Sequence, residues 1–152
     1  AKDIQLAGTR TAWEVVTTCL WHRAAYVLPV APNGSIMFQR RAAWKWRMGT
    51  LIDIGASETV EQTESYAAAA HRAVIEEIGS ASSVEALTEC CRISLTWRGA
   101  MPRMEVCESS HNRIFRAAID PEAEQGERDS EVEEIFYWSA SQFLAEVERN
   151  PF

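Results

Sequence analysis

An alanine-rich segment that ends in two glutamates and a glycine constrains the fold of this chain more than any other feature. Apolar residues recur in it at spacings of three and four, at Ala67, Ala70, Val74 and Ile78. This periodicity predicts an amphipathic helix over Glu64 to Ile78, because side chains three and four apart lie on one helix face. Alanine favours helix strongly, and Gly79 stands where a chain usually leaves a helix. One face of this helix therefore needs a partner surface.

Segments with strand character surround the predicted helix. Residues 19–30 are rich in apolar and aromatic side chains and lead into Ala31-Pro-Asn-Gly34, a turn-forming sequence, so residues 35–40 are predicted to return as the second strand of a hairpin. Further strands are predicted at 50–54, 91–97, 112–119 and 135–138, and a last helix at 142–149. This order of elements predicts an α+β domain with a mixed β-sheet sandwiched between helices.

Length and composition limit the function classes. The chain has 152 residues, a formal net charge of −7 and 47% hydrophobic residues. These values favour a single globular domain over residues 1–152, in which residues 1–18 form an N-terminal extension or a first strand. No apolar run reaches the ~18 residues of a membrane-spanning helix, so no membrane partner is expected. The acidic balance argues against duplex DNA as a partner, since DNA binding rests on the neutralisation of phosphates.

The four cysteines favour an intracellular, cytoplasmic protein. Cys19, Cys90, Cys91 and Cys107 include no CxxC pair, and two of them are adjacent, which is a poor framework for disulfides or zinc. We therefore expect reduced, mostly buried thiols. The N-terminus also lacks the apolar core of a secretory signal peptide.

Charged residues are concentrated at the end of the predicted helix. Glu76 and Glu77 are adjacent, so their side chains diverge by about 100° around the helix. Arg72 lies one turn before Glu76 and can pair with it. Clustered carboxylates are the ligands that Mg²⁺ prefers, and such ions bind diphosphate oxygens and orient an attacking water. The alternative interpretation is a solvated acidic face on an amphipathic helix.

The same segment resembles the signature of the Nudix family, which runs G-x5-E-x7-R-E-U-x-E-E-x-G-U, with U an aliphatic residue. The match comprises Glu64, Arg72, Val74, Glu76, Glu77 and Gly79. Residues 20–27, 39–41 and 45, with Gly49 and Asp53, resemble the subgroup near isopentenyl-diphosphate isomerase, and residues 112–115 and 131–138 resemble late strands of the family. The resemblance covers about residues 19–150 and implies a Nudix fold.

The sequence departs from this signature at positions that matter for chemistry. The first glycine of the family signature aligns with Glu58, and the glycine before its first glutamate aligns with Thr63. The glutamate that follows the arginine of the signature aligns with Ala73. In the family this glutamate holds a metal ion together with the two that match Glu76 and Glu77, so the resemblance implies a degenerate box. Three interpretations stay open. Glu58 supplies the missing carboxylate, the activity is weakened or replaced, or Glu76, Glu77 and Glu131 suffice.

The resemblance also implies residues that contact the substrate. Arg41 and Lys45 match a diphosphate-binding pair, and Trp44 lies between them, where its ring could stack on a base. Glu131 matches a region that supplies a general base or an extra metal ligand. The alternatives are ordinary surface packing and a solvated acidic loop. Isomerase activity is not expected, because the catalytic cysteine of that subgroup falls on Ser57.

The predicted function is a divergent Nudix-type hydrolase that cleaves a diphosphate linkage in a nucleoside diphosphate derivative or a similar small molecule. Its cofactor would be Mg²⁺ or Mn²⁺, held by Glu76, Glu77 and Glu58, and its activity would be reduced. Arg72 would orient Glu76 or Glu64. The alternative is a catalytically impaired binding or assembly module. Nucleic acid is not expected, although the basic loop at residues 40–47 leaves RNA open, and a homodimer is a further expectation.

Overall fold

A computed structural model of the chain describes residues 8–79, 86–101, 104–122 and 130–149. In chain order the elements are α1 (Ala12–Thr17), β1 (Trp21–Val30), β2 (Ile36–Arg41), β3 (Ile52–Ile54), β4 (Ala56–Thr59), α2 (Tyr66–Ala73), the π-helical turn η1 (Val74–Ile78), β5 (Thr88–Met101), β6 (Met104–Ala118), β7 (Val132–Trp138) and α3 (Ala140–Arg149). The strands form one seven-stranded sheet with the order β3-β2-β1-β6-β5, to which β4 adds on β1 and β7 on β2.

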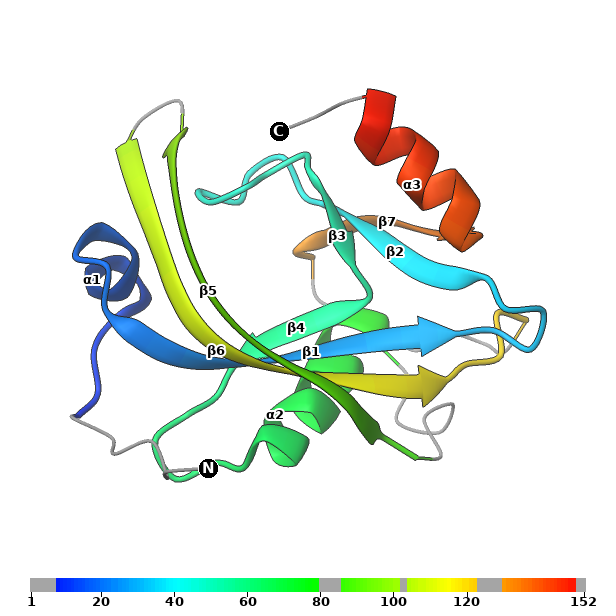
Figure 1. Cartoon of the computed structure of the whole chain (residues 1–152), viewed down its shortest axis with the longest axis horizontal. Coiled ribbons are helices and arrows are strands. Elements are labelled where there is room, and N and C mark those ends of the chain that lie inside the picture. The colour runs from blue at the N-terminus through cyan, green and yellow to red at the C-terminus, as the bar shows by residue number, and fades with distance from the viewer. Residues whose placement is uncertain (1–7, 80–85, 102–103, 123–129, 150–152) are drawn as a thin grey trace.

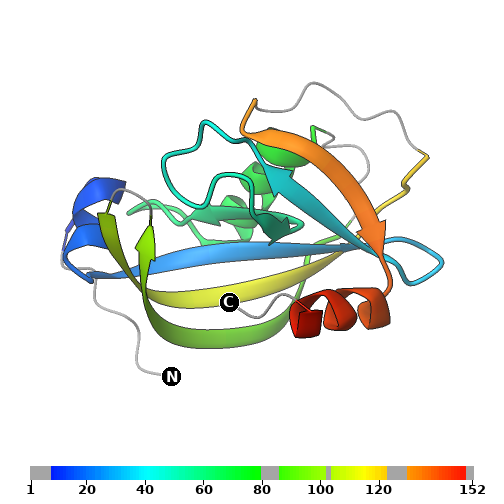
Figure 2. The same cartoon turned by 90° about the horizontal axis from the view of Figure 1, so that it is seen from above.

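The sheet is mixed, as predicted. Strands β1 and β6 lie side by side in parallel, with Ala24 opposite Asn112, while the other pairs are antiparallel. β1, β6 and β5 run together along the length of the molecule (Figure 2). The predicted hairpin joins β1 to β2, and Gly34 takes the positive φ of 83° that its turn requires.

Helices cover both faces of the sheet. Helix α2 lies under β1 and β6, and α3 lies on the other side near β2 and β7 (Figure 1). Neighbouring residues of β2 show the two faces, because side chains alternate along a strand. Met37 packs in the core cluster with α2, whereas the ring of Phe38 stacks on Phe143 of α3 at 4.9 Å. The α+β architecture with a mixed sheet between helices is therefore confirmed.

The alanine face of α2 is the buried one. Ala69, Ala70 and Ala73 have no exposed surface and pack with Ala25 and Val27 of β1 in one hydrophobic cluster. Small side chains let the helix approach the strand closely. The helix starts at Tyr66, two residues later than predicted, because Ser65 accepts a hydrogen bond from the Ala68 amide and acts as the N-cap.

Two short elements were not predicted. Residues 12–17 form helix α1, closed by a capping box between Thr11 and Glu14, so the expectation of a first strand in the N-terminal segment is wrong there. Strand β4 adds four residues to β1 just before the predicted helix. The sequence also predicts a loop or short turn at 82–87 and a polar, acidic loop at 121–130, and most of both segments lies outside the described residues. In the described part of the chain, no helix has the length and apolar character needed to cross a membrane.

The prediction of reduced, mostly buried cysteines is wrong. Cys19 and Cys107 form a disulfide across a sequence separation of 88, and Cys90 and Cys91 are exposed on β5. The cause is the strand register. Trp21 lies opposite Ser109 in the parallel β1–β6 pair. Two residues earlier on each side, the same register places Cys19 beside Cys107, so their sulfurs can meet. Spacing along the sequence contains no information about this contact.

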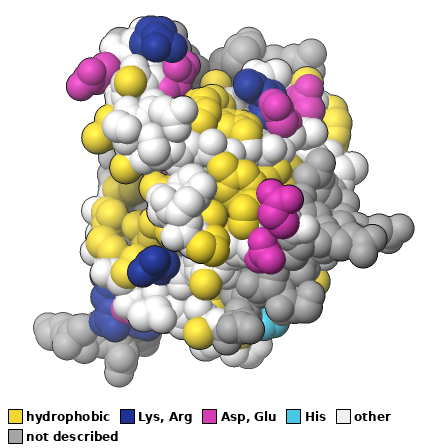
Figure 3. All heavy atoms as spheres, turned by 90° about the vertical axis from the view of Figure 1, so that its right-hand side faces the viewer, with side chains coloured by type: hydrophobic (Ala, Val, Ile, Leu, Met, Phe, Trp, Pro, Cys, Tyr) yellow, Lys and Arg dark blue, Asp and Glu magenta, His cyan; other side chains and the backbone are white. Residues whose placement is uncertain are grey.

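The homodimer stays a prediction. Hydrophobic side chains form patches on the face seen from the right of Figure 1, with acidic and basic groups around them (Figure 3). Leu144 of α3 is 59% exposed, and no side chain of α3 is buried. An apolar surface of this kind does not by itself identify a partner.

Candidate active site

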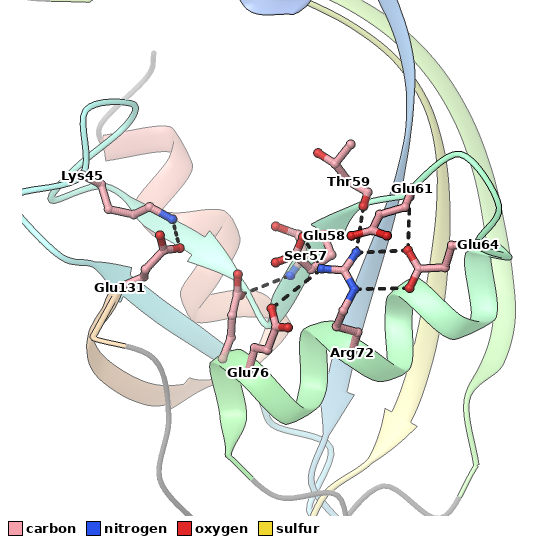
Figure 4. A network of polar contacts seen from close by, with 10 residues as sticks. Lys45, Ser57, Glu58, Thr59, Glu61, Glu64, Arg72, Glu76 and Glu131 are labelled. Atoms are coloured by element: carbon pink, nitrogen blue, oxygen red, sulfur yellow. Dashed lines mark hydrogen bonds and ion pairs between the residues drawn. The ribbon is translucent and has the colours of Figure 1, made fainter. Parts of the chain in front are cut away.

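Arg72 is the centre of the charged cluster (Figure 4). Its guanidinium Nη1 lies 2.9 Å from Glu58 Oε2 and 3.8 Å from Glu76 Oε2, and its Nη2 lies 3.0 Å from Glu64 Oε2. The same Nη2 donates to the carbonyl of Thr59 at 3.0 Å. The predicted one-turn pair between Arg72 and Glu76 is confirmed. One guanidinium is thus shared by three carboxylates that come from a strand, a loop and a helix, and it offsets only part of their negative charge.

The local structure brings these groups together. Glu58 lies on β4 opposite Ala25 of β1, and Glu64 precedes the N-cap of α2. Glu64 also accepts a hydrogen bond from the Glu61 amide, which closes the loop between β4 and the helix. The hydrogen bond from Arg72 lowers the pKa of Glu64, whereas burial raises the pKa of Glu58 against the opposing charge of Arg72.

Glu77 lies on the inner side of the π-helical turn and is only 6% exposed. Its Oε2 accepts hydrogen bonds from Gln39 Nε2 at 2.6 Å and from the Ser57 amide at 3.2 Å. Burial raises the pKa of Glu77 to about 7, and the negative charges of Asp53 and Glu58 add to the effect while the two hydrogen bonds oppose it. A carboxyl group with such a pKa changes protonation near neutral pH, which suits acid–base chemistry.

A cavity of about 860 Å³ borders the Arg72 cluster. Glu58 and Arg72 line it together with Trp21, Arg23 and His111, but Glu76 and Glu77 are not among its described lining residues. The Trp21 ring stacks on His111 at 4.5 Å. The cavity thus combines charged groups with an aromatic surface, whereas the two glutamates at the end of the helix lie outside it.

The predicted substrate cations are paired with carboxylates. Arg41 binds Asp53 at 3.1 Å between Nη1 and Oδ2, and Lys45 forms an ion pair with Glu131, well separated from the Arg72 cluster (Figure 4). Trp44, which lies between them in sequence, is 62% exposed. A phosphate group would have to compete with Asp53 and Glu131 for these cations.

Glu108 forms two ionic contacts that the sequence did not predict. It bridges His22 Nε2 at 2.8 Å and Arg47 Nη1 at 3.0 Å. Burial raises the pKa of Glu108, but the hydrogen bond from His22 and the charge of Arg47 outweigh burial, so its pKa lies below the ordinary value. Only the β1–β6 register, which places His22 opposite Ser110, could have revealed this contact.

The carboxylates as arranged do not fit Mg²⁺ or Mn²⁺. Within the described ranges, no group of three or more His, Cys, Asp or Glu side chains could hold a metal ion. Glu58 and Glu76 share the Arg72 guanidinium, and one oxygen of Glu77 already accepts two hydrogen bonds. A divalent ion needs several oxygens around one point, and here a guanidinium lies between two of the candidates. Metal binding by these residues and by Glu131 stays a prediction.

Comparisons with known proteins agree with the sequence resemblance. The model of the NUDIX domain family matches residues 20–151. The structure is similar to DR0079 from Deinococcus radiodurans, with 17% identity, a TM-score of 0.63 and coverage of 85% of this chain and 74% of that one. It is similar to the MutT protein from Methanosarcina mazei, with 15% identity, a TM-score of 0.63 and coverage of 82% and 81%. It is also similar to the NUDIX domain of Shewanella oneidensis NrtR complexed with ADP ribose, with 14% identity, a TM-score of 0.62 and coverage of 83% and 77%. No curated protein matches the chain.

Proposed function

The chain belongs to the NUDIX domain family, and on this basis we propose that it binds a small molecule with a diphosphate linkage, such as a nucleoside diphosphate derivative, and hydrolyses that linkage slowly. The observation that carries the proposal is the Arg72 cluster. In it, Arg72 forms ion pairs with Glu58 and Glu76, two carboxylates that would otherwise be available to a divalent metal.

Ligand binding is supported by the family and by the charges of the site. A NUDIX domain with a similar fold is described as complexed with ADP ribose. In this chain Arg41 ends β2 and Lys45 lies in the loop that follows. Their side chains are 12% and 14% exposed, and each forms an ion pair with a carboxylate. A diphosphate group with two or more negative charges is a stronger partner than one carboxylate, because it offers several oxygens to the same cations. Trp44 is exposed beside them for stacking on a base.

Slow hydrolysis is supported by the altered box. Ala73 replaces one carboxylate, and Arg72 draws Glu58 and Glu76 away from the role of metal ligands. A displacement of about 1 Å in a catalytic group can cost on the order of 10²-fold in rate. Glu77 is the proposed proton acceptor for the attacking water, since its pKa of about 7 leaves it partly ionised at neutral pH. Arg72 is a positioning residue, and Glu131 is a second proposed base.

A binding module without turnover is the second candidate. It is favoured by the burial of Glu77 and by its two hydrogen bonds, which restrain the carboxylate that hydrolysis would need. The two candidates share the ligand and differ only in whether the linkage is cleaved. An assay that measures binding and product release separately can therefore distinguish them.

The experiment compares the wild type with Glu77→Gln, and with Glu133→Gln as a matched control on the exposed side of β7. Binding of ADP-ribose and other nucleoside diphosphate derivatives is measured by calorimetry, and product release is measured with Mg²⁺ or Mn²⁺ present. We expect slow turnover that falls about 10²-fold in Glu77→Gln and stays unchanged in Glu133→Gln. Binding with no turnover would overturn hydrolysis and favour the binding module. The absence of both would refute the proposal as a whole.

A further inference from the structure

The disulfide between Cys19 and Cys107 lies beside a second cavity. This cavity has a volume of about 360 Å³ and is lined by Thr17, Cys19, Arg98, Gly99, Glu105, Val106 and Cys107. Cys19 is partly exposed, while Cys107 is 6% exposed. A small molecule in this cavity would therefore meet the sulfur of Cys19 before that of Cys107.

The charged residues of the cavity suit thiol chemistry. Arg98 lies opposite Cys107 in the antiparallel β5–β6 pair, and residues opposite each other in a ladder have their Cβ atoms about 5 Å apart. Arg98 forms no ion pair with another described residue, although the Glu105 carboxylate lines the same cavity. A free guanidinium next to a sulfur favours the thiolate form, which makes that sulfur a better leaving group.

The disulfide also fixes the end of helix α1. Cys19 has a φ of 56°, in the left-handed region that residues other than glycine seldom adopt. This is the usual way in which a helix ends, and the Leu20 amide donates to the Val15 carbonyl at 3.1 Å across the turn. The bond to Cys107 adds a covalent link between this helix end and β6. Trp13 of α1 contacts Trp46, which lies in the loop at residues 42–51 between β2 and β3, and their ring centroids are 5.7 Å apart.

We propose that Cys19–Cys107 is an exchangeable disulfide that small thiols reach through the 360 Å³ cavity, and that its redox state controls the contact of α1 with the loop at residues 42–51. The oxidised form holds Trp13 against Trp46. Reduction removes the covalent link between the end of α1 and β6, and thereby loosens both α1 and the loop.

Reduction of the disulfide consumes two external thiol molecules and proceeds in two exchange steps. The first, as a thiolate, attacks Sγ of Cys19, forms a mixed disulfide with it and releases Cys107 as a thiolate beside Arg98. The second attacks the external sulfur of the mixed disulfide and releases Cys19. The two external thiols leave as one disulfide and supply the two electrons that reduce the protein.

The first test measures the chemistry of the site without any nucleotide. The full chain is oxidised, and reduction by an anionic thiol (2-mercaptoethanesulfonate) and by a cationic thiol (cysteamine) is followed by alkylation and mass spectrometry. In the oxidised chain we expect a peptide pair linked through Cys19 and Cys107. The ratio of the reduction rate with the anionic thiol to that with the cationic thiol should fall several-fold in Arg98→Gln. Glu105→Gln, which removes the opposite charge from the same cavity, should raise the ratio. Absence of the linked peptide, or a ratio that neither substitution changes, would overturn the proposal.

The second test measures the structural consequence. Hydrogen exchange is compared between oxidised chain, reduced chain and a Cys19→Ser, Cys107→Ser double variant. Reduction should increase exchange in residues 12–18 and 42–51 and leave α2 unchanged, and the double variant should show the same pattern without reductant. Equal protection in both redox states contradicts the control of α1 and the loop. The loop contains Lys45, so a redox effect on ligand affinity is also expected. That effect rests on the proposed function, whereas both tests above are independent of it.

Discussion

Replacing Arg72 tests whether one guanidinium holds the site together. Arg72→Gln leaves Glu58 and Glu64 without the cation that lies 2.9 and 3.0 Å from their oxygens. Hydrogen bonds to charged groups contribute roughly 1.5–3 kcal/mol each. This range is discounted here, because the Arg72 side chain is 28% exposed and solvent screens part of the interaction. We therefore expect a loss of about 2–4 kcal/mol in unfolding free energy, or roughly 5–12 °C in Tm for a chain of this size.

The assay is denaturant unfolding with thermal melting, and Arg149→Gln is the matched control. Arg149 pairs with Glu146 at 2.9 Å, but its side chain is 71% exposed, so its removal should cost less than about 0.5 kcal/mol. Added Mn²⁺ should also raise the Tm of Arg72→Gln more than that of the wild type, because the variant lacks the positive charge that competes for these carboxylates. If Arg72→Gln is as stable as Arg149→Gln, the reasoning about the cluster is refuted.

Three further predictions concern other parts of the structure. Burial raises the pKa of Glu77 from 4.5 to about 7 in the folded chain, so folding favours the protonated carboxyl. The unfolding free energy should therefore fall by ~3 kcal/mol as the pH rises from 4.5 to 7. Urea titrations should show this pH dependence in the wild type but not in Glu77→Gln. Glu131→Gln frees Lys45 and should tighten ADP-ribose binding several-fold in calorimetry, whereas Lys45→Gln should weaken it. Gly55→Ala should lower the unfolding free energy by ~3 kcal/mol or more in urea titrations, because Gly55 has a φ of 50° and an added Cβ would lie 2.0 Å from the carbonyl oxygen of Val27.

Local patterns predicted the elements whose contacts are near in sequence. The apolar spacing correctly predicted Ala70, Val74 and Ile78 as buried, but Ala67 is exposed, and Ala69 and Ala73 complete the buried face instead. Asn33-Gly34 identified the β1–β2 turn. The Arg72–Glu76 pair was predictable for the same reason, since both residues lie on one helix a single turn apart.

The missed features depend on how distant strands are aligned. The Glu108 contacts and the Cys19–Cys107 bond both follow from the parallel register of β1 and β6, which no sequence spacing encodes. The π-helical turn at 74–78 was hidden as well, because its residues have the same helical periodicity as α2. This turn places Glu77 inward towards Gln39 while Glu76 stays near Arg72.

The last prediction asks whether two of the departures from the signature, Glu58 and Ala73, depend on each other. Ala73 is fully buried among the apolar residues of the core, so Ala73→Glu alone would place a carboxylate in the core while Glu58 still occupies the adjoining charged cluster. Adding Glu58→Gly removes that competing charge, and we expect the double variant to be more stable than Ala73→Glu alone and to bind Mn²⁺ more tightly than the wild type. Paramagnetic titration with urea unfolding measures both. If the two substitutions affect stability additively, Glu58 has not compensated for Ala73, and the two positions changed independently.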